Sequence, residues 1–188
     1  FNQKEWRAAD ELTDDPRWNG YEVPPKSNAN YAWILNMVSK LSENGVAGYI
    51  LANGALSGGG EEYKIRKKLI ENDIVESIVI LPQNMFYTTN ISVTLWILNK
   101  NKKERTLRLP DTTRHYRDRS HEILFLDLRE IGVPFEKKFT AFSEEQVRNI
   151  AKTYHDWQQK DKGYENRPEY CYSSTLAEVR SKDYSLVP

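Results

Sequence analysis

Two short, continuous apolar runs most strongly limit the folds open to this chain. Residues 46–53 (VAGYILAN) and 75–82 (VESIVILP) each match a strand buried on both faces, a pattern typical of parallel sheets. A third strand-like run, residues 91–100, follows too soon for a crossover helix, because a parallel return needs roughly a dozen residues or more. We therefore expect the second and third strands to be antiparallel neighbours.

Helix-like segments surround the first of these strands. Apolar residues at helical spacing predict one helix from about residue 30 to 41 and another after the glycines that follow residue 53. Those glycines fit neither common phosphate-binding pattern, so a plain strand-to-helix turn is the favoured interpretation and a phosphate cradle the alternative. The order helix, strand, helix, strand, antiparallel strand is half of an α/β sheet, and we expect the other half to lie before Phe1.

The second half of the chain is more polar. Residues 100–119 carry eight Lys or Arg against three Asp or Glu. A solvated loop is the favoured interpretation of such a basic insertion, and contact with nucleic-acid phosphates is the alternative. Residues 122–128 predict a further strand, and Ser143 with Gln146 forms a capping box at the start of a helix. We expect the tail, residues 160–188, to pack against a neighbour.

Composition excludes several classes of protein. The formal net charge is zero, and no apolar run approaches the ~18 residues of a membrane span. Cys171 is the only cysteine, which favours a reducing compartment such as the cytoplasm. The three histidines lie in different segments at no ligand spacing, so no metal site is expected. No G-x-S-x-G nucleophile elbow is present, which leaves reactions that depend mainly on positioning, such as methyl transfer from a sulfonium donor.

Several longer stretches together resemble one known family. They are ANYAWILNMVSKL, GVAGYILANGAL with its trailing glycines, E-x-x-I-R-K-K-L, the closing DYSLVP and, most specifically, LPQNMFYTTNISVTLWILNKNK at residues 81–102. Over nearly its whole length the chain resembles the modification (methylation) subunit of type I restriction–modification systems. The resemblance implies a DNA adenine methyltransferase that uses S-adenosylmethionine. It also implies an α/β fold, a partial doubly wound, Rossmann-like methyltransferase sheet of the later strands that ends in an antiparallel hairpin.

The same resemblance implies a domain division and site residues. We expect residues 1–130 to be the C-terminal half of the catalytic domain and residues 131–188 an α-helical C-terminal extension. Phe1 would be the phenylalanine of the family's catalytic Asn-Pro-Pro-Phe signature, stacking on an adenine flipped out of the duplex. The wall of that adenine pocket is expected from Asn84, Phe86, Tyr87 and Asn53. If the basic segment contacts DNA phosphates, the expected residues are Arg105, Arg108, Arg114, Arg117 and Arg119.

The remaining expectations concern activity and partners. The Asn-Pro-Pro of the signature and the family's S-adenosylmethionine loop are not in this sequence, so we expect the chain alone to be inactive. Double-stranded DNA, a specificity subunit and a restriction subunit are the partners that the resemblance implies, and no membrane contact is expected. A non-catalytic module for binding DNA or another subunit, on a decayed methyltransferase fold, stays open as an alternative. So does methyl transfer to cytosine or to a protein glutamine.

Overall fold

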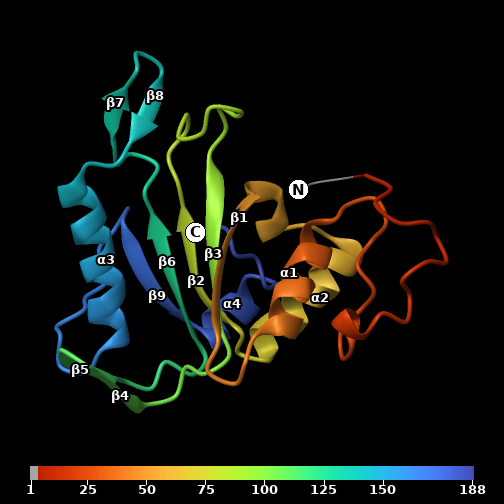
Figure 1. Cartoon of the computed structure of the whole chain (residues 1–188), viewed down its shortest axis with the longest axis horizontal. Coiled ribbons are helices and arrows are strands. Elements are labelled where there is room, and N and C mark those ends of the chain that lie inside the picture. The colour runs from red at the N-terminus through yellow and green to blue at the C-terminus, as the bar shows by residue number, and fades with distance from the viewer. Residues whose placement is uncertain (1–3) are drawn as a thin grey trace.

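The computed structural model describes residues 4–188 and contains a five-stranded mixed sheet between helices (Figure 1). In spatial order the strands are β1 (Val46–Ala52), β3 (Val93–Asn99), β2 (Val75–Ile80), β6 (Glu122–Asp127) and β9 (Cys171–Thr175). The helices are α1 (Asn30–Lys40), α2 (Gly60–Glu71), α3 (Glu144–Gln158) and α4 (Leu176–Ser181), with 3-10 turns η1 (Pro16–Trp18) and η2 (Asn53–Leu56). The α/β fold class expected from the sequence is confirmed.

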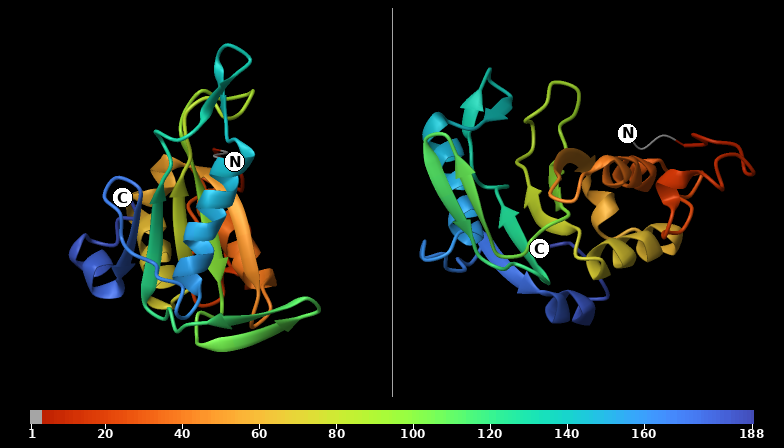
Figure 2. Two further views of the ribbon diagram at one scale, coloured as in Figure 1. Left: turned by 90° about the vertical axis from the view of Figure 1, so that its left-hand side faces the viewer. Right: turned by 60° about the horizontal axis from the view of Figure 1, so that its bottom comes forward.

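Alternate residues of the strands point into separate cores on the two faces of the sheet. Ile78 of β2 belongs to the core under α1, α2 and α4, whereas its neighbour Val79 belongs to the core under α3. Figure 2 shows α3 on one side of the sheet and α1 and α2 on the other. Trp157 anchors α3 with a fully buried ring, and the expected capping box of Ser143 and Gln146 starts that helix.

The direction of the strands defines the two ends of the sheet. β3 is antiparallel to both β1 and β2, as expected for the second of these pairs, and β6 is parallel to β2. The carboxyl ends of β1, β2 and β6 therefore lie at one end of the sheet, the upper end in Figure 1. The hairpin β7 (Val133–Phe135) and β8 (Phe139–Ala141) stands at this end, and the hairpin β4 (Arg105–Leu109) and β5 (Thr112–Tyr116) lies at the opposite end.

Strand β1 is an edge of the sheet and is not buried on both faces, so that expectation is wrong for β1. Val46 is 53% exposed and the residues of β1 alternate in burial, while all six residues of β2 are buried. The cause is position: among residues 4–188, β1 has β3 as its one strand partner. An unpaired edge leaves backbone donors and acceptors available to another strand.

The C-terminal residues belong to the same body as the rest of the chain. β9 pairs antiparallel with β6, and Leu186 is fully buried in the core shared with α1 and α2. The Leu186 N–H donates to the Leu56 carbonyl at 3.0 Å, and buried Arg66 donates to the Tyr184 carbonyl at 2.8 Å. The tail therefore packs against the core of its own chain. The expected boundary at residue 130 does not separate two cores, because the core under α3 contains residues from both sides of it. Residues 131–188 form strands as well as helices.

The basic segment is also more ordered than a solvated loop. Residues 105–116 form the β4–β5 hairpin, with Arg105 opposite Tyr116 and Leu109 opposite Thr112. Most of its residues are exposed, which is why no alternation of buried and exposed positions marks its strands in the sequence. Across the part of the chain that the structure describes, no helix has the length and apolar character needed to cross a membrane.

Candidate functional site at the carboxyl end of the sheet

Ligands of open α/β sheets bind at the carboxyl ends of the strands, so this end is the candidate functional site. Phe1, the expected stacking residue, lies outside the described residues. Asn53, directly after β1, accepts a hydrogen bond from the Thr94 hydroxyl at 2.7 Å. Its amide also approaches the hydroxyl of Ser92 at 3.5 Å, and that hydroxyl donates to the Leu81 carbonyl at 2.6 Å. These contacts hold Asn53 against β3 and give it a structural function that requires no ligand.

Asn84 borders a cleft of about 670 Å³ between the loop after β2 and the β7–β8 hairpin. We call this cavity the hairpin cleft; its polar lining includes Gln83, Asn84, Arg129, Lys137, Lys138 and Thr140. Asn84 has a left-handed backbone, φ 60°, and its carbonyl accepts a hydrogen bond from the Thr140 N–H at 3.0 Å. The backbone of Asn84 therefore fixes the loop to the hairpin.

Phe86 lines a different cavity. A largely apolar space of about 720 Å³ follows the free edge of β1 and is bordered by Trp33 and Met37 of α1, by Ile50 of β1, and by Phe86 and Ile91 of the loop. We call it the edge cavity. Because Asn84 and Phe86 face separate cavities, the structure does not bring the four expected wall residues together in one pocket.

Tyr87 is the most exposed of the expected wall residues. Its side chain is 73% exposed, and its ring meets the ring of Phe139 edge-on at a centroid distance of 4.7 Å. The two aromatic rings thus connect the tip of the loop with the β7–β8 hairpin.

The glycine run is held as a structural turn beside this end of the sheet. The Gly58 carbonyl accepts a hydrogen bond from Arg66 at 2.7 Å, and Gly60 begins α2 with a left-handed φ of 60°. Tyr31 of α1 donates to the Ala55 carbonyl at 2.6 Å, and burial raises the pKa of its phenol. A carbonyl that faces a guanidinium is the opposite of a cradle of N–H groups around an anion, so the geometry favours the turn.

The five arginines expected to contact phosphates fall into two groups. Arg105, Arg108 and Arg114 lie on the β4–β5 hairpin, at the end of the sheet opposite the candidate site. Arg117 is half-buried and paired with Glu122, with two guanidinium–carboxylate hydrogen bonds of 2.7 and 2.8 Å. Arg119 has no exposed side-chain surface, so its guanidinium cannot contact a phosphate in this structure.

Arg119 instead belongs to a buried polar network around Glu76. The Glu76 side chain has 0% exposure, and its two oxygens accept hydrogen bonds from Arg119, Asn99, Tyr154 and Gln158 at 2.9–3.3 Å. The Arg119 guanidinium also lies 5.4 Å from the ring centroid of Tyr116 and 5.7 Å from that of Trp157. This network joins β2, β3 and α3 through one charged pair, which is its structural function.

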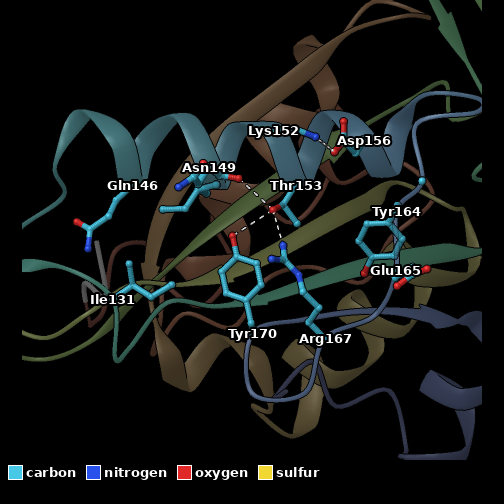
Figure 3. Close-up of a pocket in the computed structure, with 12 residues that line it drawn as sticks. Ile131, Gln146, Asn149, Lys152, Thr153, Asp156, Tyr164, Glu165, Arg167 and Tyr170 are labelled. Atoms are coloured by element: carbon cyan, nitrogen blue, oxygen red, sulfur yellow. Dashed lines mark hydrogen bonds and ion pairs between the residues drawn. The ribbon is translucent and has the colours of Figure 1, made fainter.

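A third cavity, about 630 Å³, lies between α3 and the loop at residues 163–170 (Figure 3). Arg167 points across it, donates to the Thr153 hydroxyl at 2.8 Å, and places its guanidinium 4.3 Å from the Tyr170 ring centroid. Lys152 and Asp156, which form an ion pair on α3, and Glu165 also line the space, so its charges nearly cancel. The mixed charge favours no particular class of ligand. Within residues 4–188, no three His, Cys, Asp or Glu side chains gather closely enough to hold a metal ion.

Comparison with known proteins identifies the family. The model of the N-6 DNA methylase family matches residues 1–188. The chain belongs to this family. It is 41% identical to the type I restriction enzyme HindI methylase subunit of Haemophilus influenzae, covering 100% of this chain and 39% of that protein. It is 33% identical to the MjaIX methylase subunit of Methanocaldococcus jannaschii, covering 100% of this chain and 32% of the relative.

Solved structures agree with this assignment. The methyltransferase subunit of a type I restriction–modification system from Streptococcus thermophilus superposes with a TM-score of 0.80 at 26% identity, covering 100% of this chain and 35% of that one. The N-6 DNA methylase family member described here thus spans about a third to two fifths of the length of the relatives it matches. The resemblance to a type I modification subunit noted from the sequence is confirmed.

Sequence reasoning missed several residues at the candidate end of this family member. Lys137 and Lys138 of the hairpin cleft lie in a short segment of mixed polarity, VPFEKKF, which shows no periodic pattern. The one available signal was the pair of adjacent lysines between aromatic residues. Met37 of the edge cavity is a half-buried residue of α1 that also packs against the core, and no pattern in the sequence joins it to the loop after β2.

Proposed function

We propose that this chain is the later part of the catalytic domain of a type I DNA methyltransferase, which methylates the exocyclic amine of adenine. The observation that carries the proposal is the agreement of family and geometry. The chain matches the N-6 DNA methylase model throughout, and an aromatic loop stands at the carboxyl end of its sheet. In this proposal the loop of Asn84, Phe86 and Tyr87 forms one wall of the flipped-base site, which further strands complete, and Asn53 holds that loop in position through Ser92 and Thr94.

The free edge of β1 supports the proposal that the domain needs further strands. The apolar edge cavity beside β1 and the 35–39% share of the relatives' length fit a sheet that continues beyond β1. S-adenosylmethionine is the proposed methyl donor, and its positively charged sulfonium would supply the electrophilic methyl group. The Phe1 ring is proposed to stack on the adenine.

The proposed partners are double-stranded DNA, a specificity subunit and a restriction subunit. The relatives are named as methylase subunits of type I restriction enzymes, which supports work in a complex. Contact of Arg105, Arg108 and Arg114 with phosphates is a separate proposal, supported by their place on an exposed basic hairpin. A cytoplasmic location is proposed from the one cysteine, a buried free thiol.

A second candidate is a non-catalytic module that binds DNA or a subunit. Two observations favour this module: the hydrogen bonds of Asn53 hold it against β3, and Asn84 and Phe86 line separate cavities. The described residues therefore do not form a complete pocket for a flipped base. Transfer of labelled methyl groups from S-adenosylmethionine to unmethylated duplex DNA distinguishes the two. The assay compares this chain with a longer polypeptide that carries the same sequence and the preceding strands, each with a specificity subunit. Transfer by the longer form supports the enzyme, and no transfer by either form supports the module.

A further inference from the structure

The hairpin cleft is a candidate binding site for the DNA backbone. It is bordered on one side by the loop after β2 and on the other by the β7–β8 hairpin, at the carboxyl end of the sheet. The Thr140–Asn84 hydrogen bond of 3.0 Å and the edge-on contact of Tyr87 with Phe139 join the two sides. The cleft is therefore built by folded elements on both sides.

The charge of the cleft is available to a ligand. Lys137 and Lys138 are exposed at the tip of the hairpin, and in the described structure neither has a carboxylate within ion-pair distance. Lys138 lies over the ring of Phe139, with its ammonium 5.0 Å from the centroid. Arg129, the third cation, is already paired with Asp127. Glu130 is the one carboxylate of the lining, so the unpaired charge of the cleft is positive.

Aromatic rings beside the cleft add a second chemical property, and one of them, Phe139, lines the cleft itself. Tyr87 and Phe139 form a ring pair next to the two lysines, and Phe135 on the same hairpin is 44% exposed. Cationic side chains interleaved with exposed aromatic rings suit a nucleic-acid strand, whose phosphates take the cations and whose sugars and bases take the rings. A mainly acidic protein segment would use the lysines but not the ring faces.

We infer that the hairpin cleft holds the phosphate backbone of a DNA strand, with Lys137 and Lys138 as phosphate contacts. The inference rests on the proposed function and adds a backbone site beside the loop of Asn84, Phe86 and Tyr87. It places the DNA contact at the carboxyl end of the sheet, whereas the arginines of the β4–β5 hairpin lie at the other end.

The test measures binding of the full 188-residue chain to a fluorescent unmethylated duplex, by anisotropy, over a range of salt concentrations. Replacement of both lysines (Lys137→Gln with Lys138→Gln) removes two phosphate contacts. The slope of log affinity against log salt should then become shallower by about 1.8, since each contact contributes about 0.9. The matched control is Lys67→Gln with Lys68→Gln, another exposed adjacent pair, on α2, and its slope should equal that of the unaltered chain.

The outcomes separate the inference from the proposed function. An unchanged slope for the Lys137/Lys138 variant, with an unaltered thermal unfolding midpoint, would overturn the inference. So would an equal fall for the Lys67/Lys68 control, because total charge and not the cleft would then set the binding. Absence of binding by the unaltered chain would overturn it as well. Methyl transfer by the longer polypeptide tests the proposed function independently of each of these results.

Discussion

The buried pair of Arg119 and Glu76 provides the sharpest prediction about stability. Replacing Arg119 by Met removes the guanidinium and leaves the Glu76 carboxylate in a site where both side chains have 0% exposure. Asn99, Tyr154 and Gln158 still donate hydrogen bonds to that carboxylate, but none of them carries a compensating charge. Loss of one partner of a buried ion pair costs about 3–5 kcal/mol. Domains are stabilised by only about 5–15 kcal/mol in total, so the fraction unfolded should rise sharply.

Urea denaturation, followed by circular dichroism and tryptophan fluorescence, measures the loss in free energy of unfolding. In a thermal scan the melting temperature should fall by roughly 6–20 °C, since each kcal/mol shifts it by about 2–4 °C for a chain of this size. The double variant, Glu76→Gln with Arg119→Met, should regain part of the loss, because no unpaired charge is then buried and the amide oxygen still accepts a hydrogen bond from Asn99 or Tyr154.

A matched control separates burial from ion pairing as such. Arg148 pairs with Glu144 on α3 at 3.2 Å, but their side chains are 69% and 91% exposed. Arg148→Met should therefore cost less than about 1 kcal/mol. Equal losses for Arg119→Met and Arg148→Met would refute the reasoning, because they would show that Glu76 is not desolvated as the structure has it.

Other predictions concern the tail, its pH dependence and the open sheet edge. Leu186→Ala should cost about 2–5 kcal/mol in chemical denaturation because Leu186 is fully buried, whereas Val187→Ala, at a half-exposed position, should cost less than about 0.5 kcal/mol. Hydrogen bonds from Arg180, and then from the Tyr184 hydroxyl, lower the pKa of Glu71 from 4.5 to about 2. The stability that this carboxylate contributes should therefore be present above pH 4.5 and lost as the pH falls toward 2, and Glu71→Gln should lack that part of the acid titration of the melting temperature. The free edge of β1 should cause concentration-dependent association in light scattering, and Val46→Lys should reduce it; a monomer at all concentrations without the substitution would contradict the edge argument.

The parts of the fold that the sequence predicted are those with a strong apolar pattern. The run at residues 75–82 gave β2, every residue of which is buried, and the short connection to residues 91–100 correctly required an antiparallel neighbour. The capping box at Ser143 located the start of α3. In each case burial or local hydrogen bonding requires a recognisable pattern of residues in the sequence.

The parts that the sequence did not predict depend on tertiary contacts. Cys171–Thr175 (CYSST) has little apolar character, and it is a strand because the open edge of β6 lies next to it. Arg119 looks like its exposed neighbours in a basic run, and only the fold brings it to Glu76, 43 positions away. Asn84 and Phe86 line separate cavities, and the left-handed backbone of Asn84 in the loop between β2 and β3 has no counterpart in the sequence pattern.

Methyl transfer tests the central claim most directly. Labelled S-adenosylmethionine and unmethylated duplex DNA are incubated with a specificity subunit and either this chain or the longer polypeptide that includes the preceding strands. We expect transfer to adenine by the longer polypeptide and none by the chain alone, because in the proposed function the sheet continues beyond the free edge of β1 and the donor site lies on the added strands. Transfer by the chain alone, or none by either form, would contradict the account.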